Sequence, residues 1–216
     1  LAASMTLDMA NTEKVNDFRQ DAGRLGIKVV PPSVQTSFRQ FETGDNCIYF
    51  SLAAIKGVGD AQARAVADAR TEGGAFRSLS DFARRIDHRQ VNKKALECLA
   101  NAGAFDELEP ERATAFASIE PMLATAQRRA EERAFGQVAL FGDAQEAPIK
   151  VKATPWNLGD RLQREFDAIG FFLSGHPLEA HEAAIKRLGA IRWTEFVSRA
   201  RGGQPVWTLA ASVIDR

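Results

Sequence analysis

The chain has 216 residues, with 28 basic and 28 acidic side chains, and therefore carries no net charge. Its only two cysteines, Cys47 and Cys98, form neither a disulfide framework nor a zinc motif, which predicts a reducing, cytoplasmic location. No apolar run approaches the ~18 residues of a membrane span and there is no signal peptide, so no membrane partner is expected. The length suffices for one large domain or two small ones.

The N-terminal segment predicts one helix followed by one short strand. Asn11 can cap a helix that extends to about Leu25 and ends at Gly26, with apolar side chains at helical spacing. The β-branched run 27–30 predicts a strand that Pro31 and Pro32 terminate. We expect the partners of this helix–strand segment to lie upstream of Leu1. Both ends of the chain are typical of a piece of a longer protein.

A β-hairpin is predicted next. Ser37 to Glu42 and Cys47 to Ser51 have strand-like composition, and residues 43–46 form the turn between them. Directly after this hairpin, a first helix is expected to begin at Leu52.

Residues 56–59, Lys-Gly-Val-Gly, are the most informative stretch. They lie between the apolar run 52–55 and an Ala-rich helical run, and two glycines around one apolar residue predict a tight hairpin. The next helix would begin with free N–H groups beside Lys56, an arrangement suited to one phosphate. The stretch is similar to a helix-hairpin-helix motif, which holds a DNA backbone without reading bases. An ordinary helix–helix turn is the alternative.

A second unit of the same kind follows. Apolar spacing from Phe76 to Ile86 predicts a helix capped by Ser78 or Ser80, and a polar turn around Val91 leads to a helix opened by Lys93 and Lys94. Val91 then occupies the place of Val58. Two such units would pack as a pair, because neither is stable alone at this size.

Local charge supports a polyanionic partner. Between Lys56 and Lys94 there are nine basic and five acidic residues, so this segment carries a charge of +4 and the remainder carries −4. A solvated helix face is the alternative explanation.

The second half of the chain alternates helices with polar segments. Helices are predicted over 111–135, with a break or kink at Pro121, and over 158–169 and 178–188; a strand is predicted over 204–214. Residues 143–155 predict a linker. Leu140 and Phe141, between glycines, either fold back onto the protein or dock in a partner. His176 has no companion at metal-ligand spacing and is interpreted as a turn residue.

Together these segments resemble the bacterial replicative DNA polymerase III alpha subunit. The resemblance covers essentially the whole chain, and it depends on the order and spacing of several short stretches. These are residues 1–14, 26–32, 54–59, 91–96, 102–106 and 170–178.

The resemblance implies a mainly α fold built on a tandem helix-hairpin-helix domain with a short β-hairpin. It divides the chain into the end of a fingers region, the DNA-binding domain, a clamp-binding peptide with its linker, a helical connector, and the start of an OB-fold that is cut short. The corresponding ranges are 1–34, 35–135, 136–155, 156–190 and 191–216.

The resemblance also implies partners and contact residues. Double-stranded DNA would be held without sequence preference by Lys56, Gly57, Val58, Gly59, Arg89, Asn92, Lys93 and Lys94. A sliding clamp would bind Gln137, Leu140 and Phe141, and other subunits of the polymerase III holoenzyme would be further partners.

No catalytic residue, metal ligand or cofactor is expected in this chain. In the family the polymerase carboxylates, with their Mg²⁺, lie in a palm region upstream of Leu1, so the parent protein would be a DNA-directed DNA polymerase and this piece inactive alone. A rival interpretation is a helix-hairpin-helix DNA glycosylase with Asp87 as the catalytic residue. A protein-interaction scaffold is the third possibility.

Overall fold

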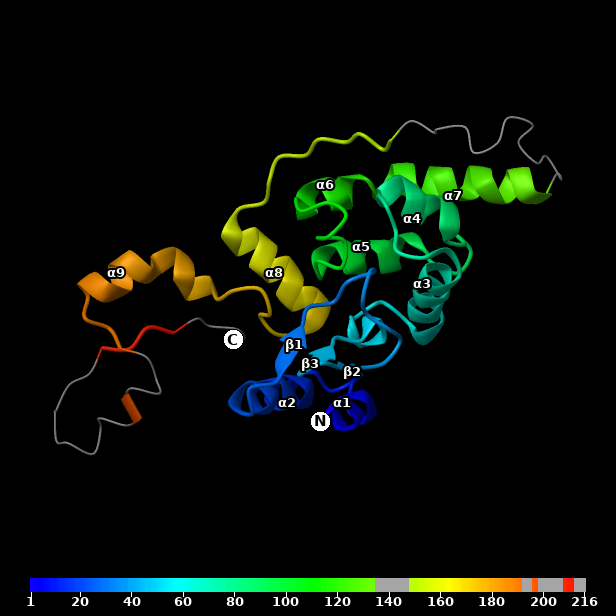
Figure 1. Cartoon of the computed structure of the whole chain (residues 1–216). Helices are drawn as coiled ribbons and strands as arrows, with labels where there is room; N and C mark the ends of the chain where they lie inside the picture. Colours follow the sequence, from blue (N-terminus) through cyan, green and yellow to red (C-terminus); the bar gives the residue numbers. More distant parts are fainter. Residues whose placement is uncertain (135–147, 192–195, 198–207, 212–216) are drawn as a thin grey trace.

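The computed structural model describes residues 1–134, 148–191, 196–197 and 208–211 of the chain (Figure 1). Within these residues the fold is mainly helical and includes one small sheet, as predicted. The helices are α1 (Ala2–Leu7), α2 (Thr12–Arg24), α3 (Asp60–Gly73), α4 (Leu79–Arg85), α5 (Lys93–Asn101), α6 (Arg112–Ala117), α7 (Ile119–Ala134), α8 (Leu158–Ile169) and α9 (Glu182–Arg187). Two 3-10 turns, η1 (Leu52–Ala54) and η2 (Pro177–His181), and three strands, β1 (Lys28–Val30), β2 (Glu42–Gly44) and β3 (Cys47–Tyr49), complete it.

Helix α2 forms as predicted, and the strand after it has a partner within the chain that the sequence analysis did not identify. Asn11 caps α2 by accepting the Lys14 N–H at 3.1 Å, and Gly26 ends the helix with a φ of 73°. Strand β1 pairs in parallel with β3, in the order β1-β3-β2. Because β1 is followed by a long excursion before β3, the sequence pattern alone did not indicate this pairing.

The β-hairpin is present, with its first strand shifted from the predicted position. Strand β2 covers Glu42–Gly44 and not residues 37–42, and Asn46 supplies the positive φ of the turn, 51°. The predicted strand residues have other partners: the Phe38 carbonyl accepts the Leu52 N–H at 2.9 Å, and the Arg39 carbonyl accepts the Ser51 hydroxyl at 2.6 Å. These bonds fix the start of η1, which is a single turn and not the full helix expected.

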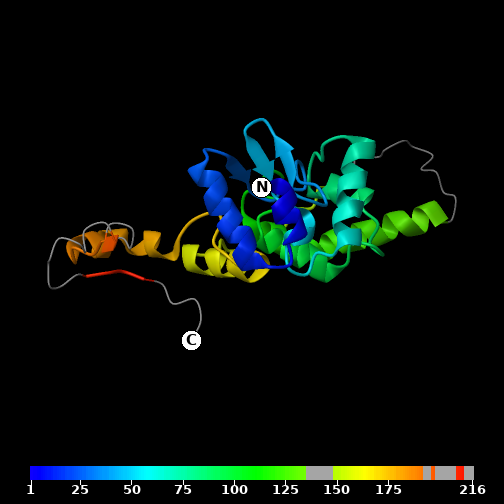
Figure 2. The ribbon, with the colours of Figure 1, turned by 90° about the horizontal axis from the view of Figure 1, so that it is seen from below.

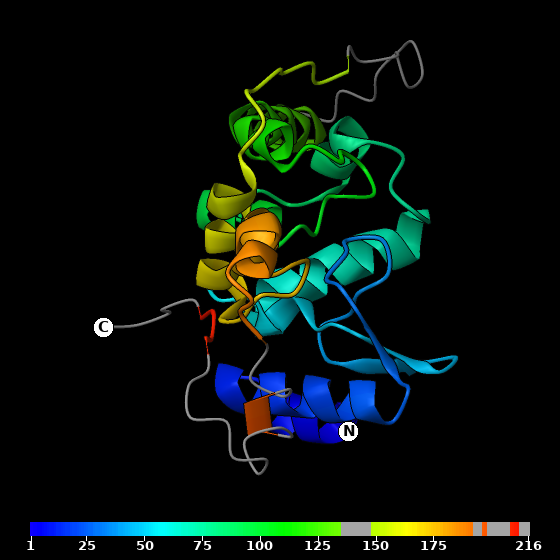
Figure 3. The ribbon, with the colours of Figure 1, turned by 90° about the vertical axis from the view of Figure 1, so that its left-hand side faces the viewer.

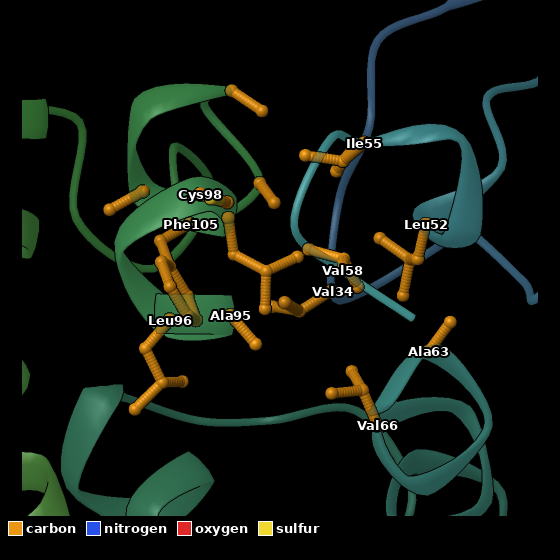
Figure 4. Close-up of a cluster of buried hydrophobic side chains, with 14 of the residues drawn as sticks. Val34, Leu52, Ile55, Val58, Ala63, Val66, Ala95, Leu96, Cys98 and Phe105 are labelled. Carbon is orange, nitrogen blue, oxygen red and sulfur yellow. The ribbon is translucent and has the colours of Figure 1, made fainter. Parts of the chain in front are cut away.

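One continuous core joins the two hairpin units. Val58 and Val91 are both buried in it, as the pairing of the two units predicted. Figure 4 shows side chains of the first unit, Ile55 and Val58, lying between helix α3 and helix α5. The rings of Phe76, Phe82 and Phe105 continue this core in edge-to-face contacts with centroids 5.0 and 5.1 Å apart.

The long predicted helix over 111–135 is two helices. α6 ends at Ser118, whose hydroxyl and N–H both bond back to the preceding turn, and α7 starts at Ile119. The predicted break is present but lies just before Pro121, at Ser118, and there is no kink at the proline, because it lies in the first turn of α7, where its missing N–H would have no helical partner. Helix α7 packs on α4 and projects from one end of the molecule (Figures 1 and 2).

Residues 148–157 contact the helices of the hairpin units. The Ile149 N–H donates to the Ser80 hydroxyl at 2.8 Å, and Trp156 packs edge-on against Phe116 with ring centroids 5.7 Å apart. Helix α8 then runs along one side of the molecule from the α6–α7 layer towards α2 (Figure 3). The predicted linker over 143–155 therefore has part of its described length bound to the core.

The C-terminal elements lie away from the core. The predicted helix over 178–188 is divided into η2 and α9, which lie to one side of the other helices (Figure 2). Helix α9 buries no side chain. Of the predicted strand over 204–214, only residues 208–211 are described, and Leu209 forms an isolated parallel bridge with Ile191. No helix within the described ranges combines the length and apolar character that crossing a membrane requires.

Candidate nucleic-acid interface

The first hairpin is a tight turn whose geometry requires glycine. The Val58 N–H donates to the Ile55 carbonyl at 3.0 Å, and Gly57 has a φ of 85°. A Cβ at position 57 would lie 2.7 Å from Cys98 Sγ and 3.9 Å from Lys94 Cε. The turn therefore lies directly against α5, and the two motifs place Lys56 and Lys94 on the same small surface. Both lysines are exposed.

Helix α3 begins at this hairpin without a side-chain cap. Gly59 is its N-cap residue and has no side-chain oxygen to accept an N–H of the first turn. Uncapped N–H groups and the helix dipole favour a negative charge at this end. Asp60 lies in the same turn, but its carboxylate pairs with Arg39 at 3.1 Å.

The second hairpin is two residues longer and is closed by its own side chains. The Gln90 and Val91 N–H groups donate to the Asp87 carbonyl at 3.0 and 2.9 Å. Asn92 caps α5 by accepting the Ala95 N–H at 2.9 Å. The prediction of free N–H groups at both helix starts was therefore wrong for the second one, where the Asn92 side chain satisfies the Ala95 N–H.

Lys93 and Lys94 have different environments, although they are adjacent. The Lys93 ammonium pairs with the Glu120 carboxylate of α7, and this hydrogen bond raises the pKa of Lys93. Lys94 makes no ion pair within the described part of the chain and lies beside the first hairpin. Among the predicted contact residues, Lys56, Gly57 and Lys94 thus come together, whereas Arg89 lies on the exposed turn of the second hairpin.

Part of the local basic excess is structural. Arg70 is buried and donates to the Val34 and Ser37 carbonyls at 2.8 and 2.6 Å, and burial lowers its pKa. Arg85 donates to the Ala69 and Gly74 carbonyls, both at 2.6 Å. A charge count over residues 56–94 therefore overestimates the positive charge that a ligand could meet.

Asp87 has a structural use that disfavours the glycosylase interpretation. Its carboxylate accepts the Arg89 N–H at 2.9 Å, and its carbonyl closes the turn as described above. A catalytic carboxylate would have to face a base-sized pocket. Asp87 is instead exposed, and its hydrogen bonds join it to other residues of the hairpin.

A buried ionic network supports the site, and sequence reasoning missed it. Arg112 pairs with Glu165 at 2.9 Å and with Asp106 at 2.9 Å, and Glu165 also accepts the Leu173 and Ser174 N–H groups at 2.6 and 2.8 Å. These residues are far apart in sequence, so no local pattern predicts their meeting. The charged residue in the apolar face of α8 was the only available signal.

The pKa shifts in this network have opposing causes. Burial favours the protonated form of Glu165, but the hydrogen bonds from Ser174, Arg112 and Leu173 outweigh it and lower the pKa of Glu165. For Asp106 burial outweighs the ion pair with Arg112, so the pKa of Asp106 is raised. Burial would lower the pKa of Arg112, but its two carboxylate partners reverse that effect and raise it.

The predicted clamp-binding residues, Gln137, Leu140 and Phe141, lie outside the described residues. No group of three or more histidine, cysteine, aspartate or glutamate side chains within the described ranges could hold a metal ion. His176, interpreted as a turn residue, accepts the Leu178 N–H through its Nδ1 at 3.2 Å.

Comparison with known proteins first identifies the motif. A family model described as a helix-hairpin-helix motif matches residues 26–115, which contain both hairpins.

The comparison then identifies the larger protein from which such a segment comes. Over 98% of its length the chain is 41% identical to the DNA polymerase III subunit alpha of Caulobacter vibrioides. It is 36% identical over 90% of its length to that of Vibrio cholerae, and 40% identical over 82% to that of Thermus aquaticus. The predicted resemblance is confirmed: this chain is homologous to one segment of DNA polymerase III alpha subunits. The chain spans 19%, 17% and 14% of the length of these three relatives, respectively.

Proposed function

We propose that this chain is the duplex-holding and clamp-tethering segment of a replicative DNA polymerase. The main support is the tandem hairpin geometry: two helix starts with matching backbone, and Lys56 and Lys94 beside an uncapped helix. Backbone N–H groups and lysines contact phosphate and carry no base information, so binding would be independent of sequence.

The test is a titration of the chain with duplex DNA at two salt concentrations. Affinity should fall steeply with salt, because neutralising phosphates releases counterions. Replacing Lys56 and Lys94 together by alanine should weaken binding to unrelated duplexes equally, while Lys152→Ala, at an exposed lysine outside both hairpins, should not. A marked base preference or salt-insensitive binding would contradict the proposal.

The second part of the proposal is that residues 137–141 bind the sliding clamp. Leu140 and Phe141 would enter an apolar pocket, and the Gln137 amide would bond at its rim. Burying two such side chains provides roughly 3–6 kcal/mol, part of which is lost in ordering the peptide, so the isolated site would be weak. On DNA, the hairpins and the peptide would bind together and gain through effective concentration.

Calorimetry with purified clamp tests this part. Phe141→Ala should abolish clamp binding and leave the melting temperature unchanged. If the substitution lowered the melting temperature and left clamp binding intact, Phe141 would belong to the core of the protein.

The third part is that DNA synthesis belongs to the full-length parent, with other holoenzyme subunits as partners. The family's palm carboxylates have no counterpart in this chain, so primer extension by the chain alone should be absent. Base release that Asp87→Asn abolished would favour the glycosylase alternative.

A further inference from the structure

Helix α8 contacts the first hairpin through the hairpin's own backbone. The Lys56 N–H donates to the Ala168 carbonyl oxygen at 2.8 Å. Ala168 lies in the last turn of α8, where a carbonyl has no partner within the helix. Each group thus satisfies the other, although the two residues are far apart in the sequence and α8 lies outside the region 26–115 that matches the motif.

Three further contacts fix the position of α8. Glu165 is fully buried and is held by Arg112 and by the two N–H groups of the following turn. Gly170 ends the helix with a φ of 97°, and a Cβ there would lie 2.6–2.8 Å from side-chain atoms of Thr12 in α2. Phe171 packs against Phe50, with ring centroids 6.3 Å apart, and the Arg19 guanidinium lies over its face at 5.4 Å.

The backbone hydrogen bond to α8 is specific to the first hairpin, although α5, the helix that follows the second hairpin, also packs on α8. The second hairpin is closed by Asp87, capped by Asn92 and joined to α7 through Lys93 and Glu120. It has no backbone hydrogen bond to α8 among the described residues. We therefore expect a displacement of the end of α8 to change the first turn more than the second.

We propose that α8 is the positioning element of the first hairpin, and that Gly170 and Glu165 are positioning residues for phosphate binding at Lys56. This inference rests on the proposed DNA-binding function. The DNA-holding unit then includes residues 158–174 as well as the matched motif, because the Lys56 backbone takes one of its hydrogen-bond partners from α8.

Gly170→Ala in the full 216-residue chain tests the inference. The substitution forces a side chain into the left-handed region and against Thr12, which displaces the last turn of α8. Gly159→Ala is the matched control, because it lies in the first turn of α8, has no positive φ and would meet only Asn157 Oδ1, at 3.3 Å. The first readout is hydrogen exchange of the Lys56 amide. The second is duplex affinity at low salt, measured before and after Lys56→Ala or Arg89→Ala is added to each background.

The expected result is selective. In the parent chain and in Gly159→Ala, Lys56→Ala should weaken duplex binding about tenfold. In Gly170→Ala its effect should shrink to less than about twofold, since the hairpin is already displaced. The effect of Arg89→Ala should be equal in all three backgrounds. The Lys56 amide should exchange faster only in Gly170→Ala.

Equal effects of Lys56→Ala in the Gly170→Ala and Gly159→Ala backgrounds, or unchanged exchange at Lys56, would overturn the inference. If neither Lys56→Ala nor Arg89→Ala weakened binding by the parent chain, the proposed function would fail, and exchange at Lys56 would still decide whether α8 holds the hairpin. Should Gly170→Ala fail to fold, Glu165→Gln, which loosens α8 from Arg112, should give the same selective pattern.

Discussion

Gly59 and Asn92 begin helices α3 and α5 with almost the same backbone angles, φ −80° with ψ 168° and φ −80° with ψ 170°. Each follows a buried valine, and each belongs to one of the two hairpins. Their chemistry differs. Asn92 supplies a cap from its own side chain, whereas Gly59 leaves the first turn of α3 uncapped.

The surroundings of the two hairpins differ as well, because the second hairpin uses more of its polar groups within the protein. The second is fixed by Asp87 and by the ion pair of Lys93 with Glu120, so its polar groups serve its own structure. The first is held by the Ala168 carbonyl and by the contact of Gly57 with Cys98, and the two lysines at its surface, Lys56 and Lys94, make no ion pair within the described part of the chain. Support from neighbouring helices thus frees the first hairpin's polar surface for a ligand.

Breaking the buried Arg112–Glu165 ion pair, which holds α8 against the protein, should have the largest effect on stability. Glu165→Gln leaves Arg112 without one of its buried partners, which costs about 3 kcal/mol of unfolding free energy. Chemical denaturation at pH 7 measures this loss. A loss below about 1 kcal/mol would show that Asp106 alone satisfies Arg112.

The same pair predicts a pH dependence. Because the folded-state pKa of Glu165 is below its ordinary 4.5, its contribution is complete above that value and is lost as the pH falls through the folded-state pKa. The stability difference between the parent and Glu165→Gln should therefore narrow below pH 4.5. The neighbouring Arg112 and Arg19 stay charged over this range. Asp106, whose raised pKa acts in the opposite direction, is present in both proteins. A constant difference down to pH 3 would contradict this assignment.

Gly57→Ala should cause the next largest loss of stability. Its φ of 85° and the contact with Cys98 Sγ predict a loss of about 2 kcal/mol, measured as thermal or denaturant unfolding. Two controls separate the causes. Gly74→Ala, with a φ of 75° and open space, isolates the backbone strain, and Gly23→Ala, in α2 with neither, should be neutral or slightly stabilising. Equal losses at positions 57 and 74 would mean that Cys98 moves aside freely.

Substitutions at the two N-cap residues, Asn92 and Gly59, test whether the caps cause the difference between the hairpins. Asn92→Ala should cost about 1 kcal/mol of stability and leave duplex affinity nearly unchanged. Gly59→Asn should weaken duplex binding severalfold, since the new side chain would occupy N–H groups of α3. It should gain little stability, because the new Cβ would lie 2.5 Å from Gln62 Oε1, which must move aside. Denaturation and duplex titration on both variants check this. Unchanged affinity in Gly59→Asn would mean that the α3 N–H groups do not meet phosphate.

The two neighbouring lysines should give the smallest difference. Lys94→Ala is expected to weaken duplex binding about threefold more than Lys93→Ala, because Lys93 must leave Glu120 before it can meet a phosphate. Glu120→Gln should narrow the gap by releasing Lys93. Equal effects of the two lysine substitutions in the parent chain would argue against the asymmetry of the hairpins.

The elements of the site were predictable from sequence where a local rule decides them. Asn11, Ser78, Asn92 and Asn157 cap their helices through side-chain oxygens, and the first two were recognised as possible caps. The glycines of the first hairpin and its buried valine followed from turn chemistry and apolar spacing. The sequence analysis missed backbone partners that lie far away in the chain, as for strand β1, for residues 38 and 39 and for Ile149 beside Ser80.

The sequence by itself determined the two hairpins, their order and the family to which they are similar, because turn glycines, caps and apolar periodicity act within a few residues. Only the tertiary structure decided which hairpin keeps its polar groups available. That outcome depends on the Ala168 carbonyl, on Glu120 and on Cys98, which reach the hairpins from helices elsewhere in the fold. A hydrogen bond or ion pair between remote residues is set by how the helices pack, and no spacing along the chain encodes it.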